Sequence, residues 1–230
     1  MKHVLLILLV IPTLYAQTNS SQQIFKSPDG TFMFRYSASL VLCQPEYEKP
    51  APGIDVSNET VESRLVGWTP DSCAASMHIC PTNEVTATDT GPLHPEAIAC
   101  IAYPNSQYAG TSFIGGAFSV SEVVDAATES DCLQFDRFTT DPKKAHWKRV
   151  GGVKFRANSG GEGGLGHGLS KDTHLTFHKG KCYDIEIRMA ALTSTPFDPE
   201  TYKKMEFKRY TEVERQFRSI LGSFRFLKWL

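Results

Sequence analysis

The chain has 230 residues, with 24 Lys and Arg against 25 Asp and Glu, so its formal net charge is −1. It contains no block of basic residues, which excludes the electrostatic footprint of a nucleic-acid-binding protein. A chain of this length is typical of one large domain.

The first sixteen residues have the layout of a secretory signal peptide. Lys2 and His3 form a polar start, an apolar run extends from residue 4 to residue 14, and Ala16 precedes the predicted cleavage point. That run is about eleven residues long, shorter than the roughly 20 that span a bilayer. We therefore expect residues 1–16 to be removed and residues 17–230 to form a single α+β domain. The mature protein should be secreted or periplasmic, without a membrane span.

All six cysteines lie in the predicted mature part, and an even number in an exported chain favours disulfides. The metal-site alternative lacks any C-x-x-C pair. Cys132 ends a predicted helix and Cys182 begins a long strand expected nearby, which predicts a bond between them. Cys80 and Cys100 flank a loop, and pairing these two leaves Cys43 with Cys73.

The N-terminal half reads mostly as strands. A turn at 27–30 joins a strand at 24–25 to an alternating aromatic strand at 32–36, which predicts an opening hairpin. Residues 46–62 are typical of a long surface loop. The segment 97–103 reads as a strand, and 117–124 as a strand leading into a helix through Cys132.

The C-terminal half alternates strands with helix starts. Residues 147–156 alternate in a way that is typical of a strand, with a glycine turn or bulge at 151–152. Residues 158–168 are expected to form a flexible glycine loop. Asp198 and Pro199 predict a helix N-terminus, and Thr211 with Glu214 a second one of capping-box form. A last strand is expected at 224–226. One apolar helical face is predicted from Val213, Phe217, Ile220 and Leu221.

Residues 173–189 predict a second hairpin whose register follows from the alternation of polar and apolar residues. A three-residue loop at 178–180 places Gly180 last, in the left-handed position. His174 then lies opposite Asp184 on an exposed polar face, while Leu175, Phe177, Tyr183, Ile185 and Ile187 are buried.

These residues supply the candidate sites. His174 and Asp184 are weak candidates for an acid–base pair, against the simpler interpretation of a surface ion pair. His167, His174 and His178 are weak candidates for metal ligands. The G-x-G-x-x-G match at 161–166 lacks the helix that a dinucleotide site requires, so we expect no cofactor.

Two segments resemble a known family. SPDGTFMFRY (27–36) is similar to the opening hairpin of the PsbP-like superfamily, which often begins Gly-Phe-x-Phe-x-Tyr-Pro. The closing helix followed by ILGSFRF (220–226) is similar to that superfamily's last helix and strand. Ser37 stands where the family tends to have Pro. The resemblance implies an αβα sandwich around an antiparallel sheet, here reinforced by disulfides. It implies no specific activity.

The sequence therefore predicts a secreted or periplasmic, non-catalytic binding or accessory protein whose partner is an unidentified small molecule or protein. One alternative is a hydrolase-type enzyme that uses the face of His174 and Asp184, with the loop at 158–168 as a lid. The other alternative is a structural envelope protein.

Overall fold

The computed structural model describes residues 21–47, 65–69, 73, 80, 95–124, 126–134, 145–164, 166–193 and 198–227. The predicted signal peptide and most of the surface loop predicted at 46–62 lie outside these ranges. No helix among the described residues is long and apolar enough to cross a membrane.

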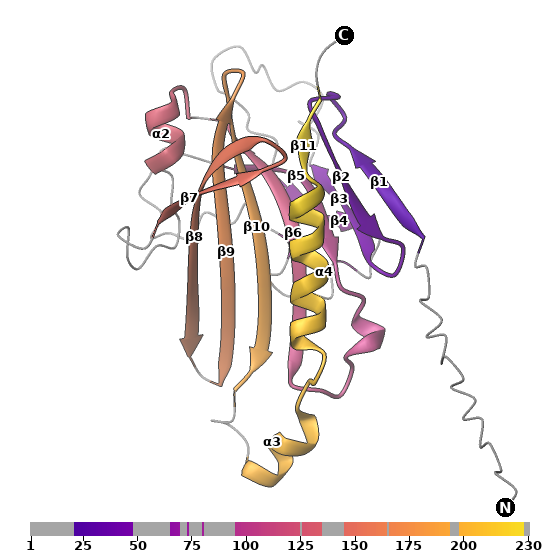
Figure 1. The fold of residues 1–230 in the computed structure, drawn as a ribbon. Coiled ribbons are helices and arrows are strands. Elements are labelled where there is room, and N and C mark those ends of the chain that lie inside the picture. Colours follow the sequence, from indigo (N-terminus) through magenta and orange to yellow (C-terminus); the bar gives the residue numbers. More distant parts are fainter. Residues whose placement is uncertain are drawn as a thin grey trace, which may run out of the picture.

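Eight antiparallel strands form the main sheet, in the order β4-β3-β5-β6-β10-β9-β8-β7 (Figure 1). Their bounds are β3 Val41–Tyr47, β4 Leu65–Thr69, β5 Pro95–Ala102, β6 Phe113–Val123, β7 His146–Val150, β8 Val153–Gly164, β9 His167–His178 and β10 Lys181–Leu192. A short 3₁₀ helix, η1, spans Asn105–Gln107.

A second sheet of three strands joins the two ends of the described chain. Strands β1 (Gln22–Lys26) and β2 (Phe32–Ser37) form the predicted opening hairpin, and β11 (Arg225–Phe226) pairs with β2. The turn is held as its residue types predict, because the Thr31 backbone N–H donates to the Asp29 carboxylate at 3.0 Å.

Helix α4 (Tyr210–Ser223) lies on the same face of the main sheet as the small sheet (Figure 1). Its predicted apolar face is confirmed, since Val213, Phe217, Ile220 and Leu221 are all buried. The predicted capping box is wrong: the helix begins at Tyr210, and no side chain caps its N-terminus.

The large core lies between the main sheet and this layer. Phe34 contacts Phe118 with ring centroids 5.2 Å apart, and Phe32 contacts Tyr183 at 5.9 Å. Gly116 on β6 leaves room for α4, because a Cβ there would lie 2.8 Å from Phe217.

The opposite face carries the short helix α2 (Glu129–Gln134), which Cys132 ties to β10 through Cys182. Helix α3 (Pro199–Met205) begins as predicted, with the Asp198 carboxylate accepting hydrogen bonds from two backbone N–H groups. The predicted antiparallel sheet with packed helices is thus confirmed.

All three predicted disulfides are confirmed. Cys43 bonds Cys73, Cys80 bonds Cys100, and Cys132 bonds Cys182, with Cα separations of 5.9, 5.8 and 5.4 Å. These separations lie in the range that disulfide geometry demands.

Candidate functional site

The register predicted for the hairpin of β9 and β10 is wrong. His178 pairs with Lys181 across a two-residue turn, and both Lys179 and Gly180 have positive φ, at 52° and 81°. This is the conformation of a type I′ turn, whose twist matches that of the strands it joins. His174 therefore lies opposite Ile185 rather than Asp184.

His174 and Asp184 consequently occupy opposite faces of the sheet. His174 shares the face of Ile185, whereas Asp184 shares the face of its partner Leu175. Neither residue is exposed as predicted, because their exposed fractions are only 3% and 4%. With the sheet between their side chains, these two residues form no acid–base pair.

The His174 side chain is buried, and its ring lies beside the ring of Phe155. Its Nδ1 has no hydrogen-bond partner among the described residues. Burial, followed by repulsion from Lys148, lowers the pKa of His174 to about 4. The imidazole is therefore neutral near pH 7.

The three histidines also do not gather around a metal ion. His167 and His178 are the first and last residues of β9, with His174 between them. At roughly 3.3 Å per residue, the two ends of this strand are about 36 Å apart. Cys43, Cys80 and Cys100 do place their sulfur atoms within 4.8 Å of one another, but all three are bonded in disulfides.

Asp184 belongs instead to a buried ion cluster with Lys171, Glu186 and Arg188. The Glu186 carboxylate contacts the Lys171 ammonium and accepts a 2.6 Å hydrogen bond from Arg188 Nε. Burial alone would raise the pKa of Glu186, but the positive charges of Arg188 and Lys171 hold it at about 2.

The pKa of Asp184, the second carboxyl of the cluster, shifts in the opposite direction. Burial, together with the negative charge of Glu186, raises the pKa of Asp184 well above its usual range. Its Oδ1 atom has no hydrogen-bond partner among the described residues.

The glycine segment predicted as a loop at 158–168 is mostly strand. Residues up to Gly164 belong to β8, and His167 already begins β9, so the two strands meet in a tight hairpin. The hydrolase hypothesis therefore loses its lid as well as its acid–base pair.

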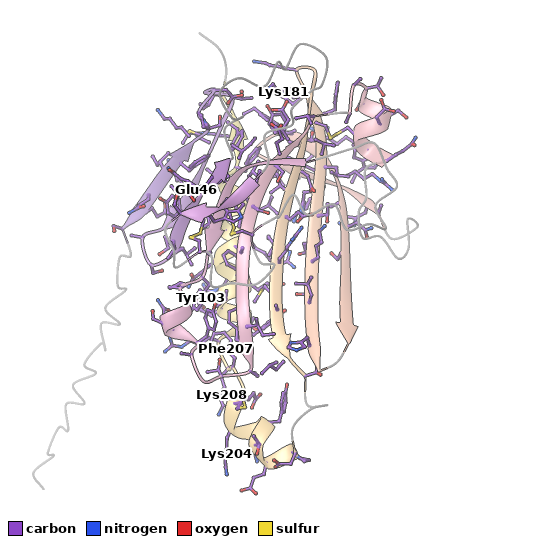
Figure 2. All side chains as sticks on the ribbon, turned by 180° about the vertical axis from the view of Figure 1, so that it is seen from behind. Glu46, Tyr103, Lys181, Lys204, Phe207 and Lys208 are labelled. Atoms are coloured by element: carbon purple, nitrogen blue, oxygen red, sulfur yellow. A yellow bond between two sulfur atoms is a disulfide. The ribbon has the colours of Figure 1, made fainter. Side chains whose placement is uncertain are left out.

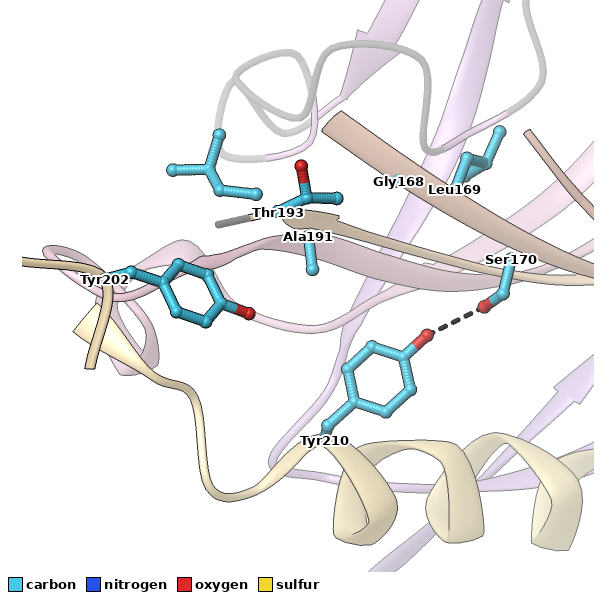
Figure 3. A pocket seen from close by; sticks show the side chains of 8 residues that line it. Gly168, Leu169, Ser170, Ala191, Thr193, Tyr202 and Tyr210 are labelled. Atoms are coloured by element: carbon cyan, nitrogen blue, oxygen red, sulfur yellow. Dashed lines mark hydrogen bonds between the residues drawn. The ribbon is translucent and has the colours of Figure 1, made fainter. Parts of the chain in front are cut away.

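A cleft of about 440 Å³ lies where the end of this hairpin meets the C-terminal helices (Figure 3). β9 and the end of β10 form one side, and α3 and α4 provide a tyrosine each. The cleft is lined by Gly168, Leu169, Ser170, Ala191, Leu192, Thr193, Tyr202 and Tyr210.

The two tyrosines are positioned differently. Tyr210 begins α4, and its hydroxyl lies 2.7 Å from the Ser170 hydroxyl, as Figure 3 shows. Its ring also meets Phe113 edge-on at 6.0 Å. Tyr202 lies on α3 and is half-buried, and its ring contacts no other aromatic ring among the described residues. Contacts with neighbouring side chains thus fix the position of Tyr210, whereas Tyr202 is positioned by the short helix α3.

The segment between these helices is anchored to the strands behind the cleft. The Phe207 backbone N–H donates to the Ser112 hydroxyl at 3.1 Å, and the Leu192 N–H donates to the Ser112 carbonyl at 2.6 Å. Phe207 also stacks on Phe113 at 4.4 Å, next to Tyr103 (Figure 2). The aromatic group of Tyr103, Phe113 and Phe207 thus supports the cleft from behind.

The lining offers hydroxyl groups and apolar surface but no ionisable acid or base other than phenol. Four of its side chains carry a hydroxyl, namely Ser170, Thr193, Tyr202 and Tyr210. Such a lining suits an uncharged ligand with its own hydroxyl groups. Tyrosines near helix starts carry no distinctive spacing, so this cleft could not be predicted from the sequence.

No family model and no curated protein sequence matches this chain. Among solved structures, a protein from Bacteroides thetaiotaomicron VPI-5482 is similar at a TM-score of 0.42 and 8% identity. That match covers 89% of this chain, which spans about half (48%) of that protein.

Two further structures are more distant. LpqN, involved in cell envelope biogenesis of Mycobacterium tuberculosis, matches at TM-score 0.33 and 11% identity, over 56% of this chain and 72% of LpqN. Cyanobacterial PsbP (CyanoP) from Synechocystis sp. PCC 6803 matches at 0.31 and 11%, over 92% of this chain and 96% of PsbP. The chain thus has a weak similarity in fold to a PsbP protein.

Proposed function

We propose that this chain is an exported, non-catalytic binding protein, and that the tyrosine-lined cleft takes an uncharged, hydroxyl-rich molecule such as a mono- or oligosaccharide. The observation that carries the proposal is the lining itself, with four hydroxyl-bearing side chains and no carboxylate, imidazole, amine or thiol.

Export is supported by two independent features. The N-terminal segment has signal-peptide layout, and all three cysteine pairs are oxidised, which suits a secreted or periplasmic location. Cleavage after Ala16 would leave Gln17 at the N-terminus, which intact-mass measurement of the exported protein detects directly.

The ligand class follows from the chemistry of the lining. A charged ligand entering this cleft would lose water without gaining an ion pair from the lining residues, which is costly. A sugar offers apolar ring faces to the tyrosines and hydroxyl groups to Ser170 and Thr193.

The test is calorimetric titration of the processed protein with a panel of neutral, acidic and amino sugars. We expect binding of a neutral member, lost in Tyr202→Ala and weakened in Tyr210→Ala. Trp147→Ala is the matched control, because Trp147 is an exposed aromatic residue on β7, outside the cleft lining. Binding by charged sugars alone, or binding untouched by both tyrosine variants, would contradict the proposal.

The structural envelope role remains the second candidate, and it differs in two measurable respects. A structural component would fractionate with the envelope, and its retention there would be unaffected by Tyr202→Ala. The binding protein should instead occur in the soluble exported fraction and respond to the same substitution by losing its ligand.

A further inference from the structure

Among the described residues, the outer edge of β8 has no partner strand over half of its length. Strand β7 pairs with β8 only as far as His146 opposite Ala157. Beyond Ala157, no described strand lies on that side, and the lower half of β8 borders the sheet in both views (Figure 1, Figure 2). The open stretch from Ser159 to Gly164 is about 20 Å long.

The turn between β7 and β8 determines which backbone groups face this edge. Val150 pairs with Val153 across the two-residue turn, and the residues flanking such a turn exchange backbone hydrogen bonds. Val153 therefore points its N–H and C=O toward β7, and alternation gives the same direction to Ser159, Gly161 and Gly163.

The hairpin on the other side agrees with this assignment. Gly164 pairs with His167 across the turn to β9, so the even-numbered residues bond to β9. Within the described ranges, Gly161 and Gly163 thus present N–H and C=O groups at the edge that bond to no strand. Ser159 presents its C=O there, whereas its N–H donates to the Asn158 side chain at 2.9 Å.

Natural sheets protect their borders with charged side chains, above all lysine, with proline or with a bulge. The open stretch reads Ser-Gly-Gly-Glu-Gly-Gly, with four glycines, no lysine, no proline and Glu162 as its single charged residue. Glycine within a strand weakens it and commonly marks a place where another backbone approaches closely. Both features indicate a docking edge.

We propose that the open edge of β8 pairs antiparallel with the same edge of a second copy of this chain. A foreign peptide added to a sheet edge is selected through side-chain pockets, and an edge of glycines offers none. A second copy brings the same flat strand, and a two-fold axis satisfies both open edges at once.

The register of this pairing follows from parity. A two-fold axis perpendicular to the sheet leaves each face unchanged, so odd residues lie opposite odd residues. Placing Gly161 on the axis sets Ser159 opposite Gly163 and uses every outward-pointing residue of the open stretch. Moving the axis by one residue toward the turn, to position 162, would place Glu162 opposite Glu162 of the second copy, with like charges facing each other. Moving it by one residue the other way, to position 160, would require Ala157, which is already paired with β7.

The contact is short and made mostly by backbone, so it falls at the small end of specific interfaces. We therefore expect a dimer that dissociates on dilution. Analytical ultracentrifugation of the oxidised, processed protein from micromolar to near-millimolar concentration measures this directly. A monomer throughout that range would overturn the proposal.

The discriminating variant is Gly163→Pro, which removes an N–H that faces the partner and leaves the bonds to β9 intact. It should be monomeric, and its melting temperature should equal that of the wild type at concentrations where the wild type is also monomeric. The matched control is Gly163→Ala, which keeps the N–H, and whose Cβ would lie 3.5 Å from the nearest atom outside its chain neighbours, the His167 carbonyl oxygen. It should remain dimeric. A dimer that persists in Gly163→Pro places the interface elsewhere and overturns the proposal.

Hydrogen exchange provides a test without substitution. In the wild-type protein the amides of Gly161 and Gly163 should gain protection as concentration rises. The amides of Gly160 and Glu162, already bonded to β9, should change little. Absence of this alternation would also overturn the proposal.

Discussion

Cys43 and Cys100 lie directly opposite each other on β3 and β5, yet each forms its disulfide with a cysteine outside this strand pair. The sulfur atoms of Cys43, Cys80 and Cys100 all lie within 4.8 Å of one another. Two separate disulfides are therefore close enough to exchange if one of them loses a partner.

Cys73→Ser should reveal this exchange. The freed Cys43 thiolate attacks the Cys100 sulfur, the bond to Cys80 breaks, and Cys80 leaves as a thiolate that takes up a proton. Alkylation and peptide mapping should then find the free thiol on Cys80.

The control for this exchange is Cys132→Ser, which should leave its free thiol on Cys182, outside the sulfur cluster. Alkylation of Cys43 in the Cys73→Ser variant would show that the strand pair does not permit the exchange.

The pKa of His174 predicts a loss of stability in mild acid. A group whose pKa falls from 6.5 to about 4 on folding favours the folded state above pH 6.5. That contribution is lost as pH falls from 6.5 toward 4, and it reaches at most about 3 kcal/mol.

An NMR titration should find the imidazole of His174 neutral at pH 5.5. As the pH is lowered from 6.5 to 4, the free energy of unfolding should decrease less steeply in His174→Gln than in the wild type. Equal slopes in the two proteins would contradict the assignment.

Replacing the carboxylates of Asp184 and Glu186 by amides should change the stability of the protein in opposite directions. Because the pKa of Asp184 is raised on folding, its contribution to stability is present at low pH and lost as pH rises through the folded value. Asp184→Asn should therefore stabilise the protein at neutral and higher pH.

The paired substitution, Glu186→Gln, removes the charge that Lys171 and Arg188 share, and should cost about 3–5 kcal/mol. Chemical denaturation at pH 5 and pH 8 compares the two variants. Equal destabilisation by both would refute this account of the cluster.

Replacement of glycine by alanine should have opposite effects on stability at Gly116 and at Gly222. At Gly116 a Cβ would lie 2.8 Å from the Phe217 ring, so Gly116→Ala should destabilise the protein by about 1–3 kcal/mol.

At Gly222 in α4 no atom outside its chain neighbours and the helix's own backbone lies within 4 Å of a Cβ, so Gly222→Ala should stabilise by up to about 1 kcal/mol. Thermal unfolding of both variants checks the contrast, and a neutral Gly116→Ala would show that α4 can shift.

Local chemistry predicted much of this fold. The turn at 27–30, the Asp198 cap and the apolar face of α4 follow from residue types and spacing, because each depends on neighbours close in sequence. The three disulfides agree with the predicted pairing, which depends on where a helix and several strands are expected to lie, since six cysteines allow fifteen connectivities.

The hairpin of β9 and β10 shows why the candidate site could not be predicted in the same way. The alternation of polar and apolar residues predicts the register only if one face of the hairpin is buried and the other is exposed, but both faces of these strands are largely buried. Glu186 and Arg188 read as surface residues because charged side chains are seldom buried unless paired. Their pairing depends on Lys171 of the neighbouring strand. The cleft likewise assembles from four elements that only the completed fold brings together.

The pairing of β11 with β2 has a consequence for the timing of folding. Strand β2 is synthesised well before β11, the second strand with which it pairs, because β11 is among the last described residues. The Arg35 N–H likewise donates to the hydroxyl of Ser223, which is synthesised 188 residues later. Phe32 and Phe224, whose rings stack at 5.1 Å, come from the same two distant segments. The N-terminal hairpin therefore cannot reach its final environment until β11 has emerged, and such long-range closure is slow. In a growing or translocating chain, the opening aromatic segment must remain without these C-terminal partners until that later event.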